Sequence, residues 1–85
     1  MTNQEVLDSL TRILSDLLAN DSIQLTAATR REDVAGWDSF SYINFIVAVE
    51  QQFDIKFGVA EVESFENVGA IVQRTLALST GRDRR

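Results

Sequence analysis

The sequence predicts an all-α domain: a four-helix bundle of three main helices plus a short third helix, with a long first loop. Two long segments, residues 4–18 and 39–53, place apolar side chains at the spacing of helices with buried faces. The 85 residues are enough for one small core. The chain has no proline and only four glycines, so a turn-rich all-β fold has little support.

The first expected helix covers residues 4–18. Thr2 and Glu5 have the spacing of a capping box, in which each side chain accepts a hydrogen bond from the other residue's N–H group. The polar run 20–22 predicts where this helix ends. Its apolar face is formed by Val6, Leu7, Leu10, Ile13, Leu14, Leu17 and Leu18.

Residues 19–38 have no sustained apolar period, and we expect a loop there. A connection of this length is unusual in so small a domain. We therefore expect Ile23, Leu25 and Val34 to hold the loop against the core.

The segment 39–53 is expected to be the central helix. Asp38 is a favourable N-cap residue, and Ser41 can add a local hydrogen bond. The segment is so rich in apolar side chains that several neighbours must cover it. A strand is excluded by its length, since 15 residues without a turn signal exceed an ordinary strand.

The third helix is expected to be short. Residues 54–60 form a loop that contains Gly58, and Val62 and Phe65 indicate one or two helical turns after it.

The last helix is expected to begin after Asn67, a good N-cap residue, and to end near Gly81. Residues 1–80 then form a single domain, and residues 81–85 are expected to be a flexible, Arg-rich tail. The inward-facing residues of this helix are Val68, Ile71, Val72, Leu76 and Leu78.

Composition excludes several classes of function. Without cysteine or histidine there is no disulfide, no thiol catalysis, no Cys/His zinc site and no histidine base. Ser39 therefore lacks a base that would make it a nucleophile, and Lys56 is a poor substitute, so we expect no enzyme. The net charge of −5 argues against a nucleic-acid partner.

Localisation follows from similar absences. No apolar run approaches the roughly 18 residues of a membrane span, and the N-terminus lacks the features of a secretory signal. We expect a cytoplasmic protein with no membrane partner, and a monomer.

Asp38 and Ser39, at the start of the central helix, have two interpretations. In the first, Asp38 caps the helix and Ser39 is only a small polar residue at the first position. In the second, Ser39 anchors a phosphoester, because unpaired N–H groups and the helix dipole favour negative charge there.

Three segments resemble the acyl carrier protein family, which includes peptidyl and other thiolation domains. They are Asp38-Ser39-Phe40, the run 47–55 (VAVEQQFDI) and the run 65–69 (FENVG). The first is similar to the family's Asp-Ser-Leu motif, the second to the end of its second helix and the third to the start of its last helix. The resemblance extends over residues 4–78.

The resemblance implies a carrier without catalytic activity. Ser39 would receive 4′-phosphopantetheine from coenzyme A through a separate, magnesium-dependent phosphopantetheinyl transferase, and Ser41 is a rival attachment site. The thiol of that group would hold acyl or aminoacyl thioesters for acyl-transferring or condensing enzymes. Asp38 would cap the helix and also help to position magnesium in the transferase complex.

Departures from the family pattern indicate a specialised carrier. Phe40 replaces the usual leucine, and Asn44, Gln51 and Gln52 stand where carriers of primary fatty-acid synthesis often have acids. Weaker charge should reduce steering by enzymes that recognise acids. We therefore expect a carrier in a dedicated pathway, such as polyketide, nonribosomal peptide, lipid or glycan assembly. Because the sequence starts at Met1, we expect a discrete protein rather than a domain of a larger synthase. The expected partner contacts are Phe40, Asn44, Ala48, Glu50 and Gln51.

An apolar cargo could fold back between the second and third helices. The residues expected to line its pocket are Ile43, Ile46, Val47, Val62, Phe65 and Ile71. Alternatively, these side chains already fill the core and leave the cargo in solvent.

Two alternative functions remain open. One is a peptidyl carrier, although that group often has two glycines before its motif and only Gly36 is present here. The other is a helical interaction module that has the same fold and no prosthetic group.

Overall fold

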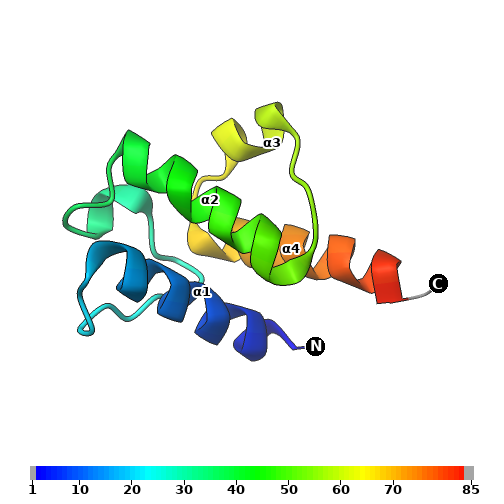
Figure 1. Cartoon of the computed structure of the whole chain (residues 1–85), viewed down its shortest axis with the longest axis horizontal. Helices are drawn as coiled ribbons and strands as arrows, with labels where there is room; N and C mark the ends of the chain where they lie inside the picture. Colours follow the sequence, from blue (N-terminus) through cyan, green and yellow to red (C-terminus); the bar gives the residue numbers. More distant parts are fainter. Residues whose placement is uncertain (1, 84–85) are drawn as a thin grey trace.

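The computed structural model describes the backbone of residues 2–83 and the side chains of residues 2–79, and within this part all regular secondary structure is helical. The long, long, short, long order of helices confirms the predicted architecture (Figure 1). The elements are α1 (Asn3–Leu18), the 3-10 helix η1 (Arg31–Asp33), α2 (Ser39–Phe53), α3 (Val59–Ser64) and α4 (Val68–Asp83).

The start of α1 is fixed by the expected capping box. The Glu5 N–H donates to Thr2 Oγ1 at 3.1 Å, and the Thr2 N–H donates to Glu5 Oε1 at 2.8 Å. The helix ends at Ala19, which has the left-handed φ of 52° and whose N–H donates to the carbonyl of Asp16. These bonds satisfy backbone groups that a helix end leaves free.

The core lies where α1 packs against both α2 and α4 (Figure 1). Phe45 from α2 is fully buried at its centre. Burying a side chain of this size contributes about 1.5–3 kcal/mol to stability. The other buried apolar residues are Val6, Leu10, Leu14, Leu25, Trp37, Tyr42, Ile46, Val49, Phe57, Val68, Ile71 and Val72.

The loop between α1 and α2 is held against the core, as expected. Leu25 is buried, and Ile23 and Val34 are partly buried against the core cluster. Trp37 also enters the core and meets the ring of Phe45 edge-on, with ring centroids 5.1 Å apart. The segment Arg31–Asp33 forms η1, a helix too short for periodicity to reveal.

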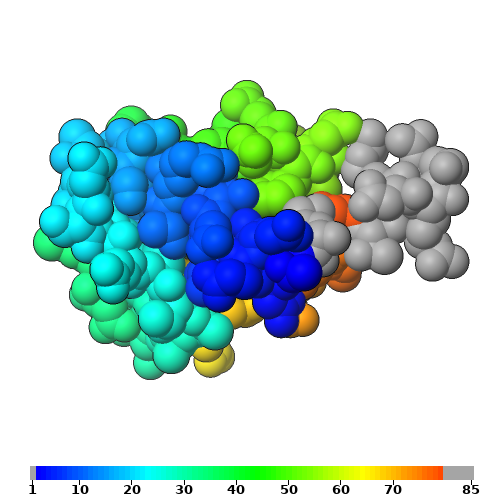
Figure 2. Space-filling view, turned by 90° about the horizontal axis from the view of Figure 1, so that it is seen from below, coloured from blue at the N-terminus to red at the C-terminus, as the bar shows by residue number. Residues whose placement is uncertain are grey.

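This loop also contacts the start of α4. The N–H groups of Val68 and Gly69 donate to the carbonyls of Thr29 and Ala27, each at 2.8 Å. Asn67 caps the same helix end as expected, since its Oδ1 accepts from the Ala70 N–H at 2.9 Å. Figure 2 shows the loop, in cyan and teal, beside α1 and next to the yellow start of α4.

Two boundaries differ from the sequence-based expectation. α3 begins directly after Gly58, and Phe65 follows it in an extended conformation. α4 continues to Asp83, so its predicted end near Gly81 is wrong. A glycine inside a helix costs only about 1 kcal/mol relative to alanine, and no proline follows to stop the helix. The predicted tail 81–85 lies partly outside the described residues, and its flexibility stays a prediction.

Candidate functional site

The N-terminus of α2 is closed by a second capping box. The Ser41 N–H donates to Asp38 Oδ1, and the Asp38 N–H donates to Ser41 Oγ, both at 2.9 Å. The backbone bond from Ser41, followed by its hydroxyl bond, lowers the pKa of Asp38 below its ordinary value of 3.8. Asp38 is therefore a carboxylate at neutral pH. Its hydrogen bond from the Ser41 N–H confirms that it caps α2, as expected.

The two serines of this turn differ in what their hydroxyls do. Ser41 Oγ is also 2.9 Å from the carbonyl of Gly36 and 3.0 Å from Asp38 Oδ1, so it is engaged within the cap. Ser39 is exposed at the first position of α2 and makes no side-chain hydrogen bond to any described residue. The available hydroxyl at this helix end is that of Ser39.

A groove of about 700 Å³ opens beside Ser39. One wall is α2, where the Tyr42 hydroxyl donates to the carbonyl of Val62 at 2.7 Å and so joins α2 to α3. Its lining is mixed in chemistry, with Arg30, Arg31 and Glu32 from the η1 side, Ser39, Tyr42 and Ile43 from α2, and residues 62–66 from α3 and the turn after it.

The expected cargo residues are only partly brought together. Ile43, Val62 and Phe65 line the groove with Ser39. Ile46 and Ile71 are buried in the core, at 4% and 2% exposed. Val47 is 44% exposed on α2 and does not line this groove. Half of the predicted pocket residues therefore lie at the groove and the other half do not.

The expected partner contacts on α2 are mostly accessible. Phe40 is 78% exposed directly after Ser39. Asn44 and Gln51 are exposed, and Ala48 is half-buried. Ala48 and Gln51 line a shallow depression of about 470 Å³ between α1 and α2. These residues are placed where another protein could reach them.

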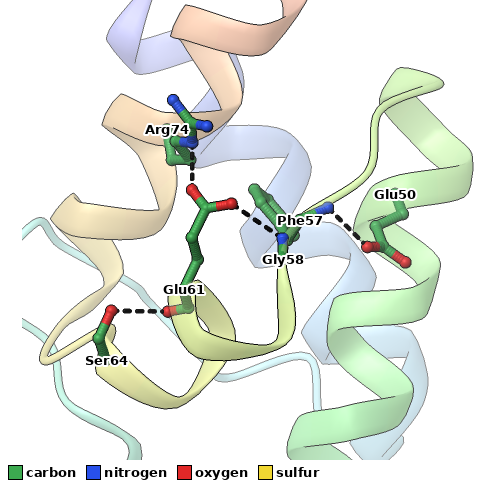
Figure 3. A network of polar contacts seen from close by, with 6 residues as sticks. All are labelled: Glu50, Phe57, Gly58, Glu61, Ser64 and Arg74. Carbon is green, nitrogen blue, oxygen red and sulfur yellow. Dashed lines mark hydrogen bonds and ion pairs between the residues drawn. The ribbon is translucent and has the colours of Figure 1, made fainter.

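Glu50 has a different environment from the other expected contacts. Its Oε2 accepts a hydrogen bond from the backbone N–H of Phe57 at 2.8 Å (Figure 3). Phe57 is buried, and its ring meets that of Phe65 edge-on with centroids 5.4 Å apart. Glu50 thus helps to fix the loop that leads from α2 to α3.

α3 is held by a second carboxylate, that of Glu61. It accepts a hydrogen bond from the Gly58 N–H at 2.8 Å and forms an ion pair with Arg74 of α4 (Figure 3). The pKa of Glu61 is lowered below its ordinary value of 4.5, chiefly by the hydrogen bond from Gly58 and to a smaller extent by Arg74. The Ser64 hydroxyl donates to the Glu61 carbonyl at 2.9 Å. The far wall of the groove is therefore tied to α4 through Glu61, as it is to α2 through the Tyr42–Val62 bond.

Sequence reasoning missed the parts of the site that depend on tertiary contacts. Arg31 places its guanidinium carbon 5.0 Å from the centroid of the Tyr42 ring. Neither Arg31 nor Tyr42 was among the site residues expected from the sequence. The one available signal was a tyrosine one turn after Ser39, because a buried tyrosine hydroxyl usually has a partner.

Comparison with known proteins gives the family. The family model described as "Phosphopantetheine attachment site" matches residues 8–75. The acyl carrier protein of Clostridium acetobutylicum is 30% identical over 67 residues, which cover 79% of this chain and 87% of that protein. The chain belongs to the acyl carrier protein family.

Other members of the family are similar in sequence and fold. The acyl carrier protein of Thermotoga maritima is 28% identical over 84% of this chain and 88% of that protein. A solution NMR structure of the holo acyl carrier protein from Geobacter metallireducens superimposes with a TM-score of 0.87 at 34% identity, covering 94% of this chain and 92% of that one.

Family membership supplies the prosthetic group and the general role. Acyl carrier proteins are carriers, not catalysts, and they hold a covalently attached phosphopantetheine. They work with phosphopantetheinyl transferases and acyl-handling enzymes. Within residues 2–83, none of the helices has the length and apolar character needed to cross a membrane.

Proposed function

We propose that Ser39 carries the 4′-phosphopantetheine and that this member of the family holds acyl thioesters in a specialised pathway, such as polyketide or lipid assembly. The observation that carries the attachment site is the contrast between the two serines at the start of α2. Ser41 is engaged in the cap, whereas the Ser39 hydroxyl is exposed and has no bond to a described residue.

The chain's own residues prepare Ser39 for the transfer. The Asp38–Ser41 capping box holds the first turn of α2 in one geometry, so the Ser39 hydroxyl projects from a rigid element. Its oxygen would form the phosphodiester by displacing the nucleotide part of coenzyme A, and the transferase would take the proton. The bound group then supplies the thiol that this cysteine-free chain lacks.

The specialised role rests on the charge of α2. Glu50 is the only charged residue among the 15 of this helix, and its carboxylate is hydrogen-bonded to Phe57. The exposed face beside Ser39 presents Phe40, Asn44, Val47 and Gln51 instead. Because steering by a basic enzyme surface needs free acids, we propose that partner enzymes recognise this face by apolar and amide contacts. We further propose that the protein acts in the cytoplasm as a monomer.

Loading with coenzyme A tests this function. The purified chain is incubated with coenzyme A, magnesium and a broad-range phosphopantetheinyl transferase, and its intact mass is measured. We expect the mass to rise by one phosphopantetheine in the wild type and not in Ser39→Ala. A wild type that stays unloaded, although a control carrier is loaded in the same tube, would instead support a helical interaction module without prosthetic group.

A further inference from the structure

The groove beside Ser39 has one cationic side and one acidic side. On the cationic side, Arg30 precedes η1 and Arg31 is its first residue. On the acidic side, Glu63 belongs to α3 and Glu66 to the turn that follows α3. Arg30 lies 3.6 Å from the carboxylate of Glu32. Arg31 has no ion pair with any residue of the described part of the chain. Its guanidinium is therefore the cation of this groove that is not neutralised by a nearby carboxylate.

The position of Arg31 is set by Tyr42. The guanidinium lies over the Tyr42 ring at 5.0 Å, which is within the range of a cation–π contact. The ring is itself held, because its hydroxyl bonds to Val62 and Trp37 lies at a centroid distance of 6.1 Å. Ser39 precedes Tyr42 by three residues on α2, so both face the same side of the helix. The cation is thus held on the wall that also presents the Ser39 hydroxyl.

We propose that Arg31 binds the phosphodiester that joins the prosthetic group to Ser39. This rests on the proposed attachment at Ser39. A guanidinium suits this ligand because its planar fork of N–H donors can bond two phosphate oxygens at once. The carboxylates of Glu63 and Glu66 repel the same anion from the opposite side of the groove. The diester therefore lies on the η1 side, and Arg31 is a positioning residue that sets the direction in which the arm leaves α2.

Phosphorus-31 NMR of the loaded protein tests this proposal. Wild type, Arg31→Gln, Arg31→Lys and Arg30→Gln are each loaded, and their intact masses are recorded first. We expect the diester resonance of Arg31→Gln to move towards its position in loaded wild type unfolded by urea, and to lose the dependence on salt that the folded wild type shows. Arg30→Gln is the matched control, because Arg30 already has Glu32 as a partner.

Arg31→Lys separates charge from ring contact. It keeps the cation, so its resonance should lie closer to the wild type than that of Arg31→Gln. If both variants shift the phosphorus resonance equally, and the apo proteins show the same change at the Tyr42 amide, the effect passes through the ring and the proposal is wrong.

The remaining outcomes distinguish the two proposals. A loaded Arg31→Gln protein with the wild-type resonance and salt dependence contradicts the role of Arg31 and leaves attachment at Ser39 intact. Equal shifts in Arg30→Gln and Arg31→Gln contradict a specific role for Arg31. A wild type that gains no mass contradicts attachment at Ser39, and with it the ligand proposed for Arg31.

Discussion

The hydroxyl of Tyr42 donates to the carbonyl of Val62 at 2.7 Å, and this bond connects the central helix to the short one across the groove at Ser39. It joins residues 20 apart in the sequence and is partly buried. The bond therefore stabilises one wall of the groove against the other.

Replacing Tyr42 by Phe should remove this bond and keep the ring. We expect the free energy of unfolding to fall by about 1 kcal/mol, since the Val62 carbonyl loses its partner. Urea unfolding followed by circular dichroism measures the change. Tyr42→Phe with the stability of the wild type would show that water replaces the hydroxyl without cost.

Ionisation of Tyr42 should lower the stability of the fold at alkaline pH. Burial raises the pKa of Tyr42 above its ordinary value of 10.0, although the charge of Arg31 partly opposes this. The neutral phenol is favoured in the folded state, so its contribution is complete below pH 10 and is lost as the pH rises through the folded pKa. Tyr42→Phe should lack this part of the alkaline loss, and parallel pH profiles of the two proteins would contradict it.

Gly69 should not tolerate a side chain. A Cβ atom there would lie 2.8 Å from the carbonyl oxygen of Ala27, which also accepts the Gly69 N–H. We expect Gly69→Ala to destabilise the fold by about 1–3 kcal/mol, because the loop must move away from α4. Thermal unfolding measures this.

Gly58→Ala is the matched control. Its Cβ would meet only the flexible carboxylate of Glu61 at 3.3 Å, and the φ of −74° suits any residue. It should cost less than about 1 kcal/mol. Equal losses at both glycines would contradict the close approach at Gly69.

Much of the fold could be predicted from local patterns. The capping boxes of Thr2 and of Asp38 depend on residues three apart, so the sequence alone reveals them. Ser39 could be named as the candidate attachment site because Asp38-Ser39-Phe40 resembles the Asp-Ser-Leu motif of the family. The burial of Phe57 was missed, because a loop has no period from which an inward face can be read.

The remaining parts of the site depend on how the helices pack. α2 is apolar on most sides, so its periodicity does not tell which residues face the core and which face the groove. Ile46 is buried whereas Ile43 is 53% exposed, although both were expected in one pocket. The contact of Arg31 with Tyr42 depends on the path of the loop, which no local pattern determines.

Restoring acids on α2 should change the choice of partner. In the double variant Asn44→Glu and Gln51→Glu, we expect kcat/KM for a fatty-acid synthase enzyme that recognises acids to rise by up to about tenfold at low salt. High salt should remove the gain, because it screens exposed charges. Gln51 and Asp16 line the same depression between α1 and α2, so a carboxylate introduced at position 51 is repelled by Asp16. The single variant Asn44→Glu is the control that lacks this repulsion. No gain at low salt in either variant would contradict electrostatic docking.

An acyl cargo should lie in the groove rather than in the core. The octanoyl form should shift the amide signals of Ile43, Val62 and Phe65 relative to the pantetheine form, and leave those of Ile46 and Ile71 unchanged. Insertion of the octanoyl chain into the core, if it contributed about 1 kcal/mol, would raise the thermal midpoint by roughly 4–8 °C in a domain of this size. For a chain that stays in the groove, we expect a smaller rise. Large shifts at Ile46 and Ile71 together with such a rise would show that the core opens for the cargo.

Fragmentation mass spectrometry of the loaded wild type tests the attachment site most directly. The peptide that contains both Ser39 and Ser41 is isolated and fragmented, so that the two serines are distinguished by the fragments that separate them. We predict that the phosphopantetheine is on Ser39, whose hydroxyl is exposed and makes no bond to a described residue, whereas that of Ser41 closes the cap on Asp38. Phosphopantetheine found on Ser41, with Ser39 unmodified, would contradict this account.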